Sequence, residues 1–160
     1  MKQKKYLKHA LKCRSKKQKQ MVINKIEDMS KPKFKVAVYG TLREANSNHA
    51  ALENSTLLGT FQTEPIFQMF SNKDAYPYLL KNGTTSITME VYEFTSKNIM
   101  DRLDALENVN GNNPLYKKEE LNTPYGKAFF YFREKKINQT DTMIINGDWN
   151  DYKHVKYTNI

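Results

Sequence analysis

The sequence lacks the features that would crosslink the chain or carry it through a membrane. It has one cysteine, Cys13, so no internal disulfide can form, and the three histidines are too scattered to complete a structural zinc site. No stretch approaches the roughly 18 apolar residues of a membrane span, and the N-terminal lysines precede no apolar run of signal-peptide length. We therefore expect a soluble, cytoplasmic protein with no metal site.

Acidic residues are nearly absent from the first 30 positions, which sets that segment apart. Residues 1–30 contain 10 Lys and Arg against 2 Asp and Glu, a net charge of +8, whereas residues 31–160 contain 16 against 15, a net charge of +1. The net charge of +9 therefore belongs almost entirely to an N-terminal extension. We expect residues 1–30 to be helical or partly disordered, and residues 31–160 to form one domain with its own core.

The basic extension suggests a partner of opposite charge. Its ten cations could bind nucleic acid or an acidic partner in a salt-dependent way. However, Tyr6 is its only aromatic residue, and the rest of the chain is nearly neutral. A solubilising tail is therefore the simpler interpretation.

Short runs of β-branched and aromatic residues predict a mainly β domain. Two short helices are expected as well, one following Asn46 or Ser47 and reaching Glu53, the other running from a cap at Ser96 to about Glu107. The turn sequence of residues 123–126 predicts a hairpin. The fold class is thus α+β, a small mixed β-barrel, closed or nearly closed, with short flanking helices. The predicted strands are residues 34–39, 58–63, 66–70, 87–94, 116–121 and 127–133.

Glu107 is a candidate acid-base residue, because its helix has an apolar stripe that includes it. On a helical wheel, Ile99, Met100, Leu103 and Leu106 span an arc of roughly 120°, and Glu107 falls inside it. Burial would raise the pKa of this carboxylate toward the range useful for proton transfer. The alternative is that the helix ends at Glu107 and the side chain faces water, which periodicity alone favours.

Two further features have both structural and functional interpretations. Asp101 and Asp104 could form a carboxylate cluster that binds a metal, but a solvated helix edge explains them more simply. The strand that ends in Tyr39-Gly40-Thr41-Leu42 could be followed by an ordinary turn, or by a loop whose backbone N–H groups bind a carboxylate or an oxyanion.

Considered together, several motifs resemble the gamma-glutamylcyclotransferase-like superfamily. Val38-Tyr39-Gly40-Thr41-Leu42-Arg43 is similar to its signature loop, and the resemblance covers about residues 34–151. The strand motif Glu90-Val91-Tyr92 matches except that Met89 replaces glycine. The remaining similar segments, in order, are Asn48-His49 with Leu52, Tyr76-Pro77, Leu103-Asp104-Ala105-Leu106-Glu107, Pro114-Leu115-Tyr116, Thr123-Pro124-Tyr125-Gly126-Lys127-Ala128 and Gly147-Asp148-Trp149.

The resemblance implies an enzyme that needs no cofactor and acts on a small γ-glutamyl compound. Glu107 matches the catalytic glutamate, and the loop of residues 39–42 would bind the glutamyl portion. Tyr39 and Tyr116 would donate hydrogen bonds in the pocket. Ordinary packing is the alternative for both tyrosines, and for Tyr116 it explains the residue equally well. The reaction would release 5-oxoproline and a free amine.

The form of the loop favours one branch of the family, the AIG2-like gamma-glutamylamine cyclotransferases. A γ-glutamyl amine is therefore the first substrate class expected, and a γ-glutamyl amino acid the second. Departures from the family pattern at Glu44, at residues 108–113 and at Arg133 surround the expected cavity mouth, where they could change the accepted leaving group. The alternative function is a non-catalytic member that binds a small ligand or a protein.

Overall fold

The computed structural model describes residues 15–73, 75–134 and 137–158 of the chain. By internal contacts the chain divides into two compact units, residues 1–33 and residues 34–160. The expectations for residues 1–14, including Cys13, lie outside the described residues. Within the described ranges, no helix combines the length and the apolar character needed to cross a membrane.

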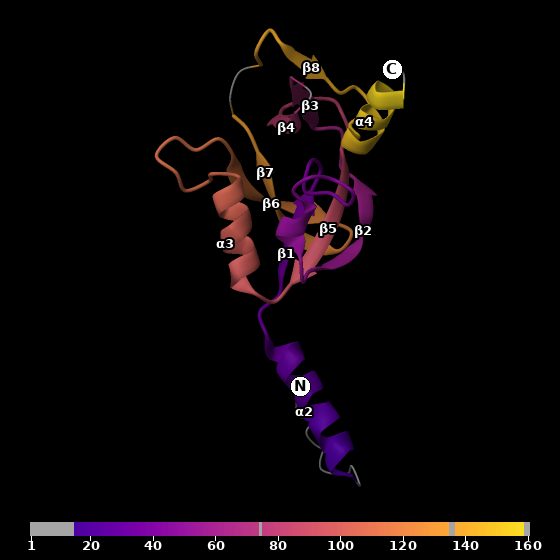
Figure 1. Cartoon of the computed structure of the whole chain (residues 1–160), viewed down its shortest axis with the longest axis vertical. Helices are drawn as coiled ribbons and strands as arrows, with labels where there is room; N and C mark the ends of the chain where they lie inside the picture. The colour runs from indigo at the N-terminus through magenta and orange to yellow at the C-terminus, as the bar shows by residue number, and fades with distance from the viewer. Residues whose placement is uncertain (1–14, 74, 135–136, 159–160) are drawn as a thin grey trace. The chain divides into compact units, whose positions relative to one another are not determined.

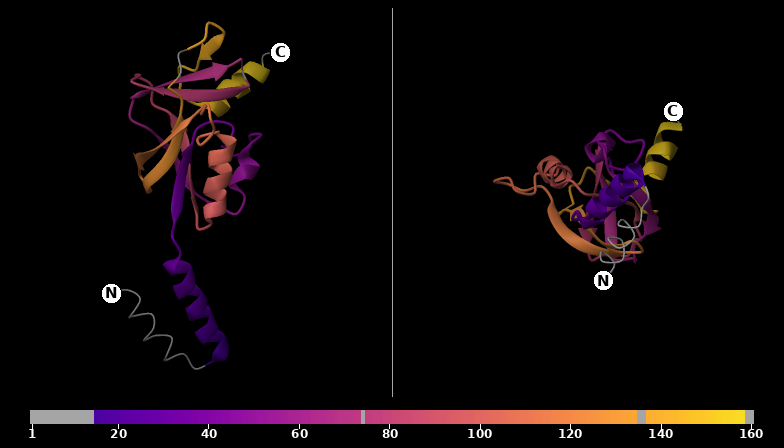
Figure 2. Two further views of the ribbon diagram at one scale, coloured as in Figure 1. Left: turned by 90° about the vertical axis from the view of Figure 1, so that its left-hand side faces the viewer. Right: turned by 90° about the horizontal axis from the view of Figure 1, so that it is seen from below.

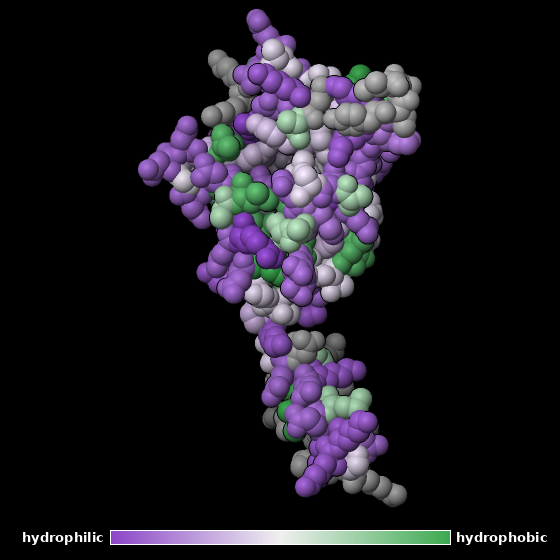
Figure 3. Space-filling model, in the orientation of Figure 1, coloured by the Kyte–Doolittle hydropathy of each residue, from purple (hydrophilic) through white to green (hydrophobic). Residues whose placement is uncertain are grey.

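In the first unit, helix α2 (Lys16–Ser30) begins at a reciprocal cap. The Gln18 amide donates to the Ser15 hydroxyl at 3.2 Å, and the Ser15 amide donates to the Gln18 side chain at 3.4 Å. The interrupted apolar stripe therefore does not prevent helix formation from Lys16 onward, because lysine and glutamine are good helix formers. Hydrophilic residues cover most of this helix in Figure 3.

The second unit contains a five-stranded sheet with the order β2-β5-β1-β7-β6 (Figure 1). β1 pairs antiparallel with β5 and parallel with β7, so the sheet is mixed. β6 and β7 form the predicted hairpin, with Thr123 opposite Gly126 and a φ of 95° at the glycine. The strands are β1 (Phe34–Val38), β2 (Thr56–Gln62), β5 (Thr88–Phe94), β6 (Lys117–Thr123) and β7 (Gly126–Phe132).

A second sheet has the order β4-β3-β8. It consists of β3 (Phe67–Asn72), β4 (Tyr76–Lys81) and β8 (Asp141–Met143). β4 was not predicted as a strand, and its second residue, Pro77, cannot donate a backbone hydrogen bond. The strand tolerates this proline because it lies at the edge of its sheet. β8 and the C-terminal helix α4 (Trp149–Thr158) were not predicted either.

The expected closed barrel is wrong, because the strands form two separate sheets. β2 and β6 are the two edges of the larger sheet and do not meet each other. β6 has the sequence KKEELNT, and charged side chains on an edge strand disfavour further strand pairing. The mainly β character and the flanking helices are as predicted.

The central strand β1 separates two hydrophobic clusters because its side chains alternate between the faces of the sheet. Val36 and Val38 pack in one cluster with residues of α3 (Lys97–Leu106) and of the 3-10 helix η1 (His49–Leu52). Ala37 and Tyr39 pack in the other cluster, with residues of the second sheet and α4. Figure 2 shows α3 and η1 on the same face of the larger sheet.

Candidate active site

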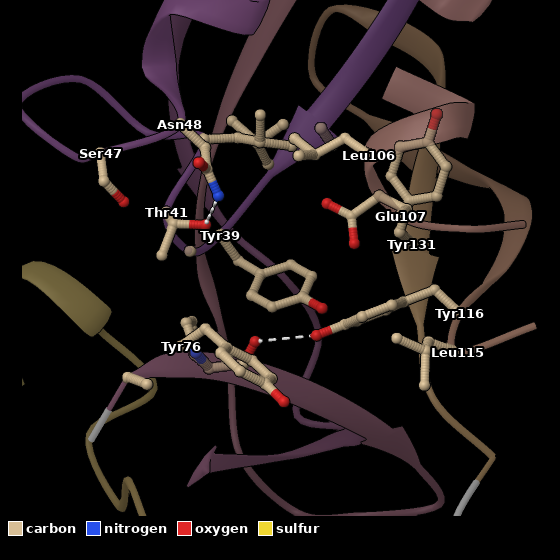
Figure 4. Close-up of a pocket in the computed structure, with 16 residues that line it drawn as sticks. Tyr39, Thr41, Ser47, Asn48, Tyr76, Leu106, Glu107, Leu115, Tyr116 and Tyr131 are labelled. Carbon is tan, nitrogen blue, oxygen red and sulfur yellow. Dashed lines mark hydrogen bonds between the residues drawn. The ribbon is translucent and has the colours of Figure 1, made fainter. Parts of the chain in front are cut away.

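A cavity of about 300 Å³ lies at the junction of the two sheets. It is bordered by the C-terminal ends of β1 and α3 and by the N-terminal end of β4. Its wall includes every site residue predicted from the sequence: Glu107, Tyr39, Gly40, Thr41, Leu42 and Tyr116. Figure 4 shows the Glu107 carboxylate and the ring of Tyr39 directed into this space. The structure therefore brings together residues that are up to 77 positions apart in the sequence.

The loop after β1 is held in place through its carbonyl groups. The Gly40 carbonyl accepts from the Arg43 amide at 2.9 Å, the Thr41 carbonyl from the Asn48 amide at 3.0 Å, and the Leu42 carbonyl contacts Nδ1 of His49 at 3.0 Å. The Asn48 side chain also donates to the Thr41 hydroxyl at 3.0 Å. With these carbonyls engaged, the amide groups of the loop are the ones we expect to face a ligand.

Gly40 is required because β4 approaches the loop closely. A Cβ atom at this position would lie 2.5 Å from Cγ of Pro77. The proline ring is stiff, so a side chain at position 40 would push the loop and β4 apart. The glycine therefore fixes one wall of the cavity.

Glu107 ends α3 as its C-cap, with its amide donating to the Leu103 carbonyl at 2.9 Å. Asn108 follows with a φ of 51°, a left-handed conformation that terminates the helix. The helix thus ends where the sequence predicted. The side chain of Glu107 nevertheless lines the cavity. It continues the inward face of α3, on which Leu103, one turn earlier, is buried in the core.

The environment of Glu107 suits proton transfer. Burial raises the pKa of its carboxyl group to about 7, while the positive charge of Arg133 acts in the opposite direction. A carboxyl group with this pKa exchanges protons readily near neutral pH. Among the residues lining the cavity it is the one carboxylate.

Tyrosine side chains surround this carboxylate. Burial raises the pKa of both Tyr39 and Tyr116, so both hydroxyls stay protonated and can donate hydrogen bonds. Tyr116 donates weakly to the Pro77 carbonyl at 3.5 Å. Tyr131 also lines the cavity, but its hydroxyl donates to Asp104 at 2.7 Å and so points away from the cavity (Figure 4).

A buried ionic network supports the loop from outside the cavity, and sequence analysis missed it. Nε of Arg43 donates to Glu90 at 3.0 Å, and Nη1 donates to Asp148 at 2.8 Å. The other Glu90 oxygen accepts from the Glu44 amide at 2.9 Å and from the Tyr92 hydroxyl at 2.8 Å. The loop is therefore fixed to β5 and to the start of α4.

Asp148 joins this network to α4. It caps the helix, accepting from the Asn150 amide at 2.8 Å and the Asp151 amide at 3.2 Å. Burial would raise the pKa of Asp148, but the Asp151 amide and Arg43 together hold it below its usual value. Asp148 therefore stays ionised when Arg43 binds it.

Asp101 and Asp104, considered earlier as metal ligands, have other partners. Asp101 lies 3.4 Å from Lys97, one turn earlier on the same helix. Asp104 binds Lys118 and Tyr131. Within the described ranges, no group of three or more His, Cys, Asp and Glu side chains is arranged to hold a metal ion.

Several cavity residues were not predicted as site residues. Ser47, Asn48 and Tyr76 are polar, while Leu106 and Leu115 are apolar and partly exposed. The sequence offered a signal for Asn48 and Tyr76, since both belong to the motifs discussed above. Leu106 and Leu115 gave none, because an exposed leucine beside a site looks like any other surface leucine.

Chemically, the cavity combines one carboxylate, the side chains of Tyr39, Tyr76 and Tyr116, and the loop after β1, whose backbone amides we expect to face a ligand. Amides of this kind bind carboxylates or oxyanions, and the carboxylate can move a proton beside them. The volume suits a small molecule of about amino-acid or dipeptide size.

Comparison with known proteins points to one family. The family model "Gamma-glutamyl cyclotransferase, AIG2-like" matches residues 36–151. This range contains every residue that lines the cavity. It does not contain the basic extension, and no comparison supports the nucleic-acid or acidic partner predicted for residues 1–30.

Individual relatives agree with the family model. The chain is 37% identical over 115 residues to a Vibrio cholerae protein provisionally named a gamma-glutamylcyclotransferase, covering 71% of this chain and 93% of that protein. It is 31% identical over 118 residues to the Escherichia coli gamma-glutamylcyclotransferase family protein YtfP, covering 74% and 97%. An uncharacterised Pyrococcus horikoshii protein has a similar crystal structure, with a TM-score of 0.65, 28% identity and coverage of 78% and 97%.

Proposed function

Because the chain belongs to the gamma-glutamyl cyclotransferase, AIG2-like family, we propose that its cavity binds a γ-glutamyl compound and cyclises it to 5-oxoproline. The observation that carries this proposal is the position of Glu107. Its carboxyl group, with a pKa raised to about 7, lies in the same cavity as the loop of residues 39–42.

The loop would bind the amino-acid end of the substrate. Its amide groups suit the α-carboxylate, since successive backbone N–H groups form a concave site for anions. Gly40 lets this loop lie against Pro77 of β4, which keeps the loop at the cavity wall. The α-amino group would then lie between the loop and Glu107.

The reaction is an intramolecular aminolysis. Glu107 takes a proton from the α-ammonium group, and the free amine attacks the γ-carbonyl carbon. A new C–N bond closes the five-membered ring, and Glu107 gives its proton to the leaving nitrogen as the bond to that nitrogen breaks. Glu107 then transfers the remaining extra proton from the ring nitrogen to the released amine, which leaves as an ammonium ion. Such an intramolecular attack can be worth an effective molarity of about 10⁵ to 10⁸ M, so the site needs chiefly to hold the reactive conformer.

Tyr39 and Tyr116 would stabilise the negative charge that develops on the γ-carbonyl oxygen. Both hydroxyls remain protonated, and Figure 4 shows them directed toward each other within the cavity. Donors already held in position toward a developing oxyanion lower the barrier without reorganising during the reaction.

Two substrate classes fit this reaction. The Tyr-Gly-Thr-Leu form of the loop favours a γ-glutamyl amine, such as a γ-glutamyl-lysine isopeptide, and a γ-glutamyl amino acid is the second class. In both, the leaving portion would extend through the mouth between Leu106 and Leu115.

The decisive test is Glu107→Gln, assayed by 5-oxoproline release from both substrate classes. We expect kcat to fall by roughly 10² to 10⁴-fold, since the amide cannot accept the proton. Glu64→Gln, the same substitution at an exposed position that does not line the cavity, is the control and should stay within several-fold of wild type. Turnover by Glu107→Gln equal to wild type would refute the role of Glu107.

The alternative is a non-catalytic binding protein with the same fold. A folded wild-type protein that releases no 5-oxoproline from a broad panel of γ-glutamyl compounds, yet binds one of them, would favour that alternative over the enzyme.

A further inference from the structure

A buried cation lies behind one wall of the cavity, and the proposed reaction does not use it. Arg133 follows β7 and is 8% exposed. The carbon at the centre of its guanidinium group lies 4.8 Å from the ring centre of Tyr78, 5.4 Å from that of Tyr116 and 5.8 Å from that of Tyr76. Tyr116 and Tyr76 line the cavity, so their rings separate the cation from the ligand space.

Arg133 has no carboxylate at ion-pair distance in the described part of the chain, and its Nε atom is buried without a hydrogen-bond partner. Asp141 and Glu107 interact with its charge at longer range. Contacts with aromatic faces compensate only part of the cost of burying a cation. An anionic group of a ligand on the cavity side would add an opposite charge close to it.

The cation acts across the tyrosine wall. Its charge partly opposes the rise in pKa that burial causes at Tyr39, Tyr116 and Glu107, all of which line the cavity. At an effective dielectric constant of about 20, opposite charges ~8 Å apart attract strongly enough to change a binding constant more than tenfold. Direct contact with the ligand is therefore not required.

The position of Arg133 distinguishes the two ends of a γ-glutamyl compound. The α-carboxylate is assigned to the loop that contains Thr41, whereas Tyr116 and Leu115 lie on the opposite side of the cavity (Figure 4). Leu115 and Tyr76 are partly exposed, so the leaving portion reaches solvent along this second side. Arg133 lies behind the same side.

We propose that Arg133 makes the cavity select γ-glutamyl compounds whose leaving group carries a carboxylate, that is, γ-glutamyl amino acids, over neutral γ-glutamyl amines. This inference rests on the proposed cyclotransferase function and reverses the order of substrate classes that the loop sequence suggests. Arg133 acts as a specificity residue, through its charge and without touching the reacting atoms.

A matched pair of substrates tests the inference. γ-Glutamyl-alanine and γ-glutamyl-ethylamine differ by a single carboxylate on the leaving group. For the wild type we expect kcat/KM to be about tenfold higher for the alanine compound. Arg133→Met should bring the ratio close to one, and Arg133→Lys, which keeps the charge, should retain several-fold preference.

A remote cation provides the control. Lys81 pairs with Glu119 and lies over the ring of Phe132, and it does not line the cavity. Lys81→Met should therefore preserve the wild-type ratio. Equal losses of kcat/KM for both substrates in Arg133→Met would show a purely structural role and overturn the inference, and so would a wild type without preference.

Binding measurements separate this inference from the proposed function. Calorimetric titration of Glu107→Gln with the same two compounds should give a lower Kd for γ-glutamyl-alanine. Equal Kd values would refute the role of Arg133 whether or not the protein is an enzyme, whereas absent turnover by the wild type refutes the proposed function. Neither the wild-type ratio nor this titration depends on whether Arg133→Met folds.

Discussion

At the scale of single residues, Glu107 has a chemical environment that its sequence neighbours did not determine. The apolar stripe placed it on the inward face of its helix, but the helix ends at that position and the side chain could equally have faced water. Which of the two occurs depends on the cavity walls contributed by distant segments, chiefly the loop after β1 and the residues just before β6. Sequence periodicity describes one element at a time and contains no information on such walls.

The raised pKa of Glu107 predicts the pH dependence of the proposed reaction. The base form is needed, and its pKa of about 7 means that this form is lost as the pH falls through 7. We expect kcat/KM to drop about tenfold per pH unit below roughly pH 6, with an acid limb centred near 7. Initial rates of 5-oxoproline release between pH 5 and 9 measure this limb.

The tyrosines cannot produce the same limb. Burial moves the pKa values of Tyr39 and Tyr116 upward, away from neutral pH. An acid limb near 4.5, the ordinary value for a glutamate, would mean that the catalytic carboxyl group is not in a desolvated cavity and would contradict the assignment to Glu107.

At the scale of elements, sequence analysis succeeded where local pattern determines structure. The hairpin of β6 and β7 follows from its turn residues, and α3 follows from its apolar face. Ser96 lies at the predicted N-cap position, although its side chain forms no capping hydrogen bond. β4 was missed because its proline argues against a strand unless the strand is known to lie at an edge. α4 was missed because it has no continuous apolar stripe and is capped by Asp148, whose position depends on tertiary partners.

The network around Arg43 joins three elements and should dominate the stability of the loop. In Arg43→Met, the buried Glu90 carboxylate and the partly buried Asp148 carboxylate would remain without their cation. Removing one partner of a buried ion pair costs about 3–5 kcal/mol, so we expect a loss of that size in the free energy of unfolding. Urea denaturation followed by circular dichroism measures it.

An exposed ion pair provides the comparison. Lys127 and Glu120 lie 3.0 Å apart across the hairpin of β6 and β7, and both are well exposed. Lys127→Met should therefore change the free energy of unfolding by less than about 1 kcal/mol. Similar losses in the free energy of unfolding for the two variants would show that the buried Arg43 network stabilises the protein no more than an exposed ion pair does.

At the scale of the whole molecule, strand content was predictable but sheet closure was not. Of the eight strands in the described part of the chain, six were identified from composition and alternation, which depend on near neighbours in sequence. Whether the larger sheet closes into a barrel depends on whether its edge strands, β2 and β6, come close enough to pair. That relation depends on twist and on the second sheet, which local patterns do not encode.

The cavity and the excess positive charge lie in different parts of the chain. Every residue that lines the cavity lies between positions 37 and 131, within the second compact unit, whereas the excess positive charge lies in residues 1–30. Deleting residues 1–30 should therefore leave kcat/KM within about twofold of the full chain. If the extension binds nucleic acid, retention on DNA that weakens with salt should disappear in the same deletion.

Deletion at the other end should behave differently. Removing residues 149–160 deletes Trp149, which is almost fully buried in the core, together with the helix that Asp148 caps. Loss of a buried tryptophan costs about 3–5 kcal/mol, so this protein should unfold at much lower urea concentration and lose activity in parallel. If instead removal of residues 1–30 abolishes turnover in a folded protein, the site does not belong to the second unit alone.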